Sequence, residues 1–386
     1  MSLPATPYGG AVDLLHALSG PHGIRASLSS NANYGAVFTR DDVMAGIAGL
    51  LLDDPLIILG LVRTLECLRD CQGPEGQIAS NYAPGDGRAP RVSFGTIVPR
   101  IDAPLWYLIG VGLAARRGAL DPLAFRESVN RVVRLLDALE YNGRHLIYIP
   151  AGGDWADEYI YEGYILHDQV LRAWALRLVG ETFGRTPWHD KANDIGRAIT
   201  AAYPRPDRAP NVDGGADIPI AAFTPTRSFD VFDLATCTLL GVSGVAPVMC
   251  APALDWIEAH YLAHGKLPPV FHPVIHEGDA DWPALQRYQV HGFRNRPHEY
   301  HNGGIWPIWL GWLALALALT ERRTSLHQLT GAASSVIGAR DDYEFTEYFH
   351  GESGVPLGTP HMAYSATGIV FLDLALTPEQ LGLLRP

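Results

Sequence analysis

Apolar positions along the chain recur mostly with the spacing of α-helices. Apolar residues stand at i, i+3, i+4 and i+7 through most segments, and Gly or Pro closes most of them. This pattern predicts about twelve helices distributed over the whole chain. Strand-like stretches are short and few: HLIYIP, the region around Gln77 to Asn81, and RVSFGTIV. We therefore predict an all-α protein with short β-hairpins in its loops.

The predicted helices are of two kinds. One kind is apolar on nearly all sides: residues 43–52, 104–113 and 305–317. The other kind keeps a clear polar face: residues 122–141, 189–203 and 325–339. A helix that is apolar on all sides is buried on all sides, whereas an amphipathic helix covers a surface. Because the two kinds alternate, the sequence predicts an (α/α)6 toroid forming one catalytic domain over residues 1–386; a two-layer helical bundle or solenoid is the alternative.

Clusters of polar residues recur beside the starts of the apolar helices. They are TRDD (39–42), PRID (99–102), GDWADE (153–158), RSFDVFD (227–233), HEYHNGG (298–304) and EYFHGE to TPHMAYS (347–365). Taken singly, an aspartate at a helix N-terminus is explained as a cap that contributes roughly 0.5–2 kcal/mol. A cap does not need aromatic neighbours, whereas a sugar site does, because pyranose faces pack on rings while carboxylates bind hydroxyls. We therefore expect the clusters to converge on one sugar pocket.

Composition restricts the classes of partner. The chain has 47% hydrophobic and 18% charged residues, which is typical of a globular protein with a large core. A net charge of -12 disfavours nucleic acid as a partner. The longest apolar run, 305–320, is shorter than the roughly 20 residues that span a bilayer, and the N-terminus lacks the features of an export signal. We expect a cytoplasmic protein with a small-molecule sugar substrate; the oligomeric state, a homo-oligomer included, stays open.

Other chemistries find little support in the motifs. His298 and His301 flank Glu299, but the chain has no HExxH motif and no paired CxxC motifs. Cys67 and Cys71 are interpreted as reduced core residues on a helix. No Gly-rich phosphate loop follows a strand, and no GxSxG motif occurs. The sequence therefore predicts neither a metal nor a cofactor.

Several segments together resemble a known family. VFTRDDVMAGIAGLLLDDP, VPRIDAPLWYLIGVGLAARRG, EYHNGGIWPIWLGWLALAL, EYFHGESG and YSATGIVFL resemble, in this order, the alkaline and neutral invertases of glycoside hydrolase family 100. YHNGGxWP is the most specific of these motifs. The resemblance implies an (α/α)6 barrel and inverting hydrolysis of sucrose without metal or cofactor.

The resemblance also implies roles for individual residues. Inverting hydrolysis uses one carboxylic acid and one carboxylate base, roughly 6.5–9.5 Å apart. Asp157 matches the family's acid, with Asp154 as the alternative, and Glu347 resembles its base, with Glu352 as the weaker candidate. The residues expected to bind the substrate are Arg40, Asp41, Asp102, Trp106, Asp154, Trp155, His301, Asn302, Trp306, Tyr348 and His361.

The chain departs from the family at two places. Where the invertases have an Asp-Arg-Arg run, this chain has Asp157, Glu158 and Tyr159, and the loop from Pro204 to Pro225 does not match. Alternatives to sucrose are glucosylglycerate, a trehalose-like disaccharide or an α-1,6-glucan branch. A sugar epimerase using His301 and His361, and a sugar binder without catalysis, are further alternatives.

Overall fold

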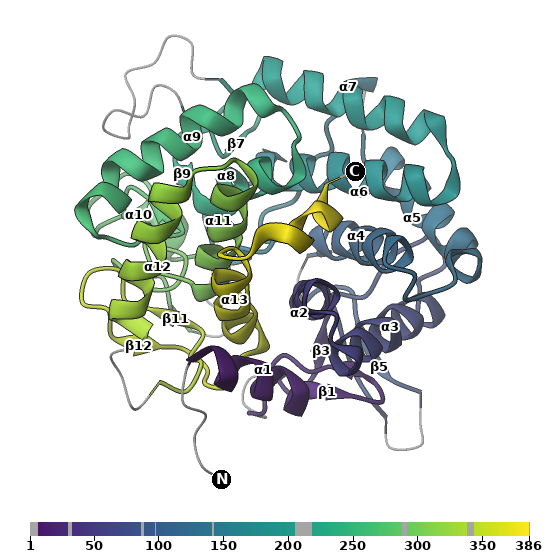
Figure 1. Ribbon diagram of the computed structural model, residues 1–386. Coiled ribbons are helices and arrows are strands. Elements are labelled where there is room, and N and C mark those ends of the chain that lie inside the picture. The colour runs from purple at the N-terminus through teal and green to yellow at the C-terminus, as the bar shows by residue number, and fades with distance from the viewer. Residues whose placement is uncertain are drawn as a thin grey trace.

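The computed structural model describes residues 7–29, 33–85, 89–96, 98–140, 143–204, 218–287, 292–337 and 343–385. Within these ranges most of the chain is helical, and the long helices lie in two concentric rings (Figure 1). The predicted (α/α)6 toroid is confirmed.

The inner ring consists of helices that are buried on nearly all sides. In two of them every residue is buried over most of the helix, from Asp102 to Ala114 and from Pro307 to Leu317. Each inner helix contacts the next in chain order, and the last contacts the first, so that the ring is closed. Its members are α2 (Thr39–Leu52), α4 (Asp102–Arg116), α6 (Leu166–Phe183), α8 (Leu234–Ser243), α11 (Pro307–Leu319) and α13 (Ala363–Leu374).

The outer ring covers the inner one with amphipathic helices. Helix α5, for example, buries only the side that carries Val129, Val132 and Leu136. Five outer helices pack on the inner helix that precedes them, whereas α1 packs on α13 and joins the two ends of the described chain. The outer helices are α1 (Pro7–Leu18), α3 (Pro55–Asp70), α5 (Arg126–Ala138), α7 (Thr186–Ala202), α9 (Pro247–His260) and α12 (Arg323–Ile337). The alternation predicted from the hydrophobic pattern is the alternation of the two rings.

Large aromatic side chains fill the centre of the inner ring. Trp106 of α4, Trp174 of α6 and Trp312 of α11 are fully buried and contact one another, with ring centroids 5.9–6.3 Å apart. Helices α11 and α13 approach closely through Gly311 and Gly368, where a Cβ atom would overlap the backbone of the facing helix. Trp106, Trp174 and Trp312 therefore belong to the core.

Short antiparallel hairpins occupy the loops. The strands are β1 (Ser19–Gly20), β2 (Gly23–Ile24), β3 (Val37–Phe38), β4 (Asn81–Ala83), β5 (Arg91–Ser93), β6 (Tyr164–Ile165), β7 (Ala222–Phe223), β8 (Ser228–Phe229), β9 (Phe232–Asp233), β10 (Phe271–His272), β11 (Tyr348–Phe349) and β12 (Pro356–Leu357). The largest sheets, β3-β4-β5 and β6-β7-β8, have three strands. Hairpins in loops were expected, and the strand expected in RVSFGTIV is β5.

The boundaries of several elements differ from the prediction. HLIYIP forms no strand but a single bridge, between Ile149 and Gly163. The segment FDVFD, expected to begin a helix, is extended until Asp233, whose side chain caps the start of α8. Both segments are mostly apolar, as the pattern indicates, but the local sequence does not reveal which groups form hydrogen bonds with their backbone. In the expected loop from Pro204 to Pro225, residues 205–217 lie outside the described residues.

Shorter elements complete the chain. Among the described residues they include the helix α10 (Trp282–Leu285) and the 3-10 segments Pro122–Phe125, Leu262–His264 and Pro378–Leu384. Among the described residues, none of the helices combines the length and apolar character needed to cross a membrane.

Candidate active site

A pocket lies at the N-terminal end of inner helices α2, α4 and α13. Its volume is about 190 Å³, which is small beside the roughly 300–1,000 Å³ of pockets for drug-sized molecules. The pocket is lined by Asn33, Tyr34, Phe38, Arg40, Asp41, Ser80, Asn81, Thr96, Arg100, Asp102, Ala103, Trp155, Asp157, Arg294, Tyr300, His301, Trp306, Glu347, Met362 and Tyr364. The predicted polar clusters converge here, with the exception of 227–233.

The first turns of α2 and α4 supply the charged floor of the pocket. Arg40 Nη1 donates to Asp102 Oδ2 at 2.8 Å, and its Nε lies 3.3 Å from Asp41 Oδ1. Burial raises the pKa of both carboxyl groups, while Arg40 favours their ionised forms. Buried charges stay in place only when they are paired, so this triad holds its oxygens in a fixed arrangement. Such oxygens suit the binding of sugar hydroxyls.

Asp157 lies on the loop that precedes α6 and faces the pocket. Arg100 donates hydrogen bonds to the Asp157 carboxylate and to the carbonyl oxygen of Gly152 in the same loop. The Asp157 side chain retains 29% of its solvent exposure, so a ligand in the pocket can reach it. The loop therefore presents one accessible carboxyl group.

Glu347 immediately precedes β11, on the pocket wall. Its side chain is buried and accepts hydrogen bonds from Tyr34 Oη at 2.9 Å and from the backbone N–H of Thr359 at 3.2 Å. Burial raises the pKa of the Glu347 carboxyl above its usual value, although Arg294 and these two hydrogen bonds favour the ionised form. Asp157 and Glu347 are 190 positions apart in the sequence, and the toroid places both on one pocket.

Asp154 does not line the pocket. It is fully buried, with Oδ1 2.9 Å from His167 Nδ1, and accepts hydrogen bonds from the Tyr161 hydroxyl and the Trp155 backbone N–H. Burial opposes its ionisation, but His167 and these hydrogen bonds lower the pKa of Asp154 below its usual value. A general acid must hold a proton and reach the substrate, so the geometry favours Asp157 over Asp154 for that role.

Aromatic rings form one wall of the pocket. His301 stacks on Trp306 with centroids 5.6 Å apart and meets Trp155 edge-on at 5.2 Å. Burial, followed by the charges of Arg294, Arg40 and Arg100, lowers the pKa of His301 well below its usual value, so this ring is neutral. The neutral His301 ring lines the pocket, and its Nδ1 has no hydrogen-bond partner among the described residues, so it can bind a sugar hydroxyl.

Besides Asp154, four residues expected to bind substrate do not line the pocket. Trp106 is in the central core, and Tyr348 packs behind Trp306 with centroids 5.6 Å apart. Asn302 is fully buried. Its side-chain oxygen accepts from the Ile275 N–H and its side-chain nitrogen donates to the Ile275 carbonyl, so it shapes the loop of the YHNGG motif. His361 precedes Met362, which does line the pocket. These positions can affect the site only through the residues that they support.

The cluster 227–233 has its own structural partners. Asp233 caps helix α8, with the backbone N–H of Thr236 donating to its carboxylate at 3.2 Å. Arg227 forms an ion pair with Asp281 at 2.6 Å. For this cluster the explanation as a helix cap is sufficient.

Sequence reasoning did not identify several residues that line the pocket, Tyr34 and Arg294 among them. Arg294 donates to the carboxylate of Glu158 and lies 4.0 Å above the ring of Tyr300. The guanidinium paired with Glu158, next to Asp157, therefore comes from a distant segment of the chain. Glu158 is buried and requires a cation as partner, but its burial is visible only in the structure.

Residues 270–376 match the model of a protein family described as alkaline and neutral invertase. The match contains the YHNGG motif, Glu347 and α13, and confirms the predicted resemblance over this part of the chain. It also confirms the predicted enzyme class, glycoside hydrolase. A search of curated proteins found no match.

Solved structures share the fold at low sequence identity. The chain is similar to a GH63 mannosylglycerate hydrolase from Thermus thermophilus in complex with glucose, with 13% identity, a TM-score of 0.69, and coverage of 96% of this chain and 100% of that one. It is also similar to a bacterial glucoamylase complexed with acarbose, with 12% identity, a TM-score of 0.69, and coverage of 98% of this chain and 56% of that one. At these identities the likeness shows the toroid itself.

Proposed function

We propose that the protein is an inverting glycoside hydrolase that cleaves a small α-glucoside, with sucrose as the first candidate. The observation that carries this proposal is that Asp157 and Glu347 line the same small pocket together with Trp155 and Trp306. An accessible carboxyl group on one loop and a buried carboxylate on another supply the acid and the base that inversion requires. The aromatic wall suits the apolar face of a pyranose ring.

Each carboxyl group has a distinct role in this reaction. Asp157 protonates the glycosidic oxygen as the bond to the anomeric carbon breaks, and Glu347 removes a proton from the water that attacks the opposite face. Arg100 donates to Oδ2 of Asp157 in the free protein, which leaves Oδ1 for the substrate. Tyr34 and the Thr359 N–H hold the Glu347 carboxylate toward the attacking water.

A related substrate class has a specific observation in its favour. Arg100, which is paired with Asp157, and Arg294 both line the pocket. Guanidinium groups bind carboxylates well, so a glycoside whose leaving group is an organic acid, such as glucosylglycerate, is the second candidate. The epimerase alternative loses support, because of its two histidines only His301 lines the pocket in the described part of the chain.

The test is proton NMR of the anomeric region during incubation with sucrose, trehalose, isomaltose, glucosylglycerate and mannosylglycerate. We expect the β-anomer of the released sugar to appear first from an α-linked substrate. The α-anomer as first product would show retention and contradict the roles given to the two carboxyl groups. Binding without cleavage of any sugar in the panel would reduce the pocket to a sugar-binding site.

A further inference from the structure

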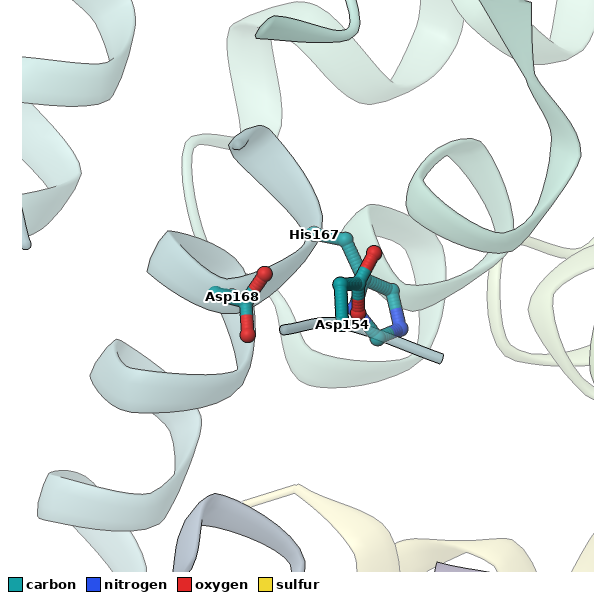
Figure 2. Close-up of side chains that lie close together, drawn as sticks. All are labelled: Asp154, His167 and Asp168. Atoms are coloured by element: carbon teal, nitrogen blue, oxygen red, sulfur yellow. The ribbon is translucent and has the colours of Figure 1, made fainter. Parts of the chain in front are cut away.

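A second group of chemically active side chains lies in the interior, outside the pocket lining. Asp154 lies on the loop that carries Asp157 (residues 152–158, called the acid loop below), and His167 and Asp168 lie in the first turn of α6. Each of the three places a ligand-type atom within 4.8 Å of the other two (Figure 2). All three residues are at most 1% exposed. None of them is needed for proton transfer in the proposed reaction.

Two members of this group lack partners among the residues that the structure describes. Neither oxygen of the Asp168 carboxyl group has a hydrogen-bond partner there, nor does Nε2 of His167. A buried polar atom without a partner costs roughly 1–3 kcal/mol, and more when it is charged. The tyrosine and the backbone N–H that satisfy Asp154 do not extend to Asp168. An ionised Asp168 therefore needs a partner that the described side chains do not supply.

The spacing of the atoms suits a metal ion. Nδ1 of His167 and Oδ1 of Asp154 are 2.9 Å apart. Neighbouring ligands of an octahedral ion at roughly 2.1 Å lie roughly 3 Å from each other, so these two atoms can occupy adjacent positions. A divalent ion with two carboxylates and a neutral imidazole is electrically balanced, which a buried site requires. Asp102 and Asp233 also exert their negative charge on His167, which favours a cation at this place.

We propose that Asp154, His167 and Asp168 bind a divalent metal ion that fastens the acid loop to helix α6. Carboxylate oxygens with one imidazole suit Mn²⁺ and related first-row ions. The ion has a structural role, because Asp154 faces away from the pocket while Trp155 and Asp157 of the same loop line it. The proposal does not depend on the hydrolase assignment, since metal binding is measured without a sugar.

The experiment uses the tag-free, full-length protein, with Mn²⁺ as the probe, because Mn²⁺ binds poorly to the free cysteines. Protein stripped with a chelator is titrated with Mn²⁺ by calorimetry and by the loss of the free-ion EPR signal, and its Tm is measured with and without the ion. We expect one Mn²⁺ per chain and a higher Tm with metal, because an ion that binds only the folded state stabilises it. Absence of both effects in the native protein would overturn the proposal and leave the group as an ion pair beside a protonated carboxyl.

Two variants assign the site. Asp168→Asn is expected to lose at least about tenfold in Mn²⁺ affinity, since it removes a charged ligand. Asp42→Asn is the matched control: Asp42 is equally buried but accepts hydrogen bonds from Thr64 and the Ile24 N–H, and this variant should bind Mn²⁺ like the native protein. Binding retained in Asp168→Asn, or lost equally in both variants, would place the ion elsewhere.

Discussion

The hydroxyl of Tyr34 donates a hydrogen bond to Oε1 of Glu347 at 2.9 Å, across 313 positions of sequence. Tyr34 stands just before β3, at the entrance to inner helix α2, while Glu347 immediately precedes β11, ahead of the last inner helix. The bond thus joins the first and last quarters of the chain where the ring closes. In the proposed reaction it holds the base, and it makes the acidic limb of the pH profile dependent on a residue outside every recognised motif.

Tyr34→Phe should move the acidic limb of activity to higher pH. Glu347 must be ionised to act as a base, and its pKa is already raised by burial. The Tyr34 hydrogen bond lowers that pKa by favouring the ionised form, so its removal raises the pKa further. Activity is then lost at a higher pH as the pH falls. The measurement is kcat/KM against pH on the substrate that the NMR panel identifies.

Tyr148→Phe is the control for this prediction. Tyr148 is 41% exposed and does not line the pocket, so its variant should keep the native pH profile. If the acidic limb of Tyr34→Phe coincides with that of the native enzyme, then either Glu347 is not the base or Tyr34 does not lower its pKa.

Asp157→Asn and Glu347→Gln should each lose most activity with the fold intact. A positioned acid or base contributes roughly 10² to 10⁴-fold to the rate, and both substitutions keep the size of the side chain. The exposed Asp190→Asn variant serves as the control and should be as active as the native enzyme. The measurements are the turnover number of each variant and its circular dichroism spectrum. Near-native activity in Asp157→Asn would show that another group is the acid.

Arg294→Met should destabilise the protein, because it leaves the carboxylate of Glu158 buried without its cation. We expect a loss of roughly 1–3 kcal/mol in the free energy of unfolding, less than for a fully buried pair, since the Arg294 side chain is 27% exposed. Urea unfolding of the single variants and of the double variant Glu158→Gln with Arg294→Met measures the coupling. If the two single losses simply add, the pair contributes no coupling energy and this explanation is wrong.

The sequence predicts most of the fold because inner-ring and outer-ring helices have different patterns of hydrophobic residues. Helices α4 and α11 have to be apolar all round, α5 and α7 only on one side, and these patterns can be read without knowing the partners. The same holds for Arg40, Asp41 and Asp102, which stand at the starts of inner helices. All three line the pocket.

What the sequence could not supply is contact between distant segments. Nothing around Tyr34 or Arg294 distinguishes them from surface residues, since their value depends on Glu347 and Glu158 far along the chain. Conversely, Trp106 follows a polar cluster as a sugar-binding tryptophan would, yet its position one turn inside α4 places it on the central core. Whether a residue next to a motif reaches the pocket is decided by its angle on the helix.

Gly368→Ala should destabilise the toroid at the contact between α11 and α13. A Cβ atom at residue 368 would overlap the carbonyl group of Pro307, and backbone cannot move aside as a flexible side chain can. Overpacking of this kind costs roughly 1–3 kcal/mol in the free energy of unfolding.

Gly196→Ala on the outer helix α7 is the matched control, because a Cβ there has no neighbour within 4 Å. That variant should gain roughly 0.5–1 kcal/mol, since alanine is the better helix former. Thermal and urea unfolding of both variants measure the opposite signs; a neutral Gly368→Ala would mean that the two inner helices can separate, and that the ring is less tightly closed than its contacts indicate.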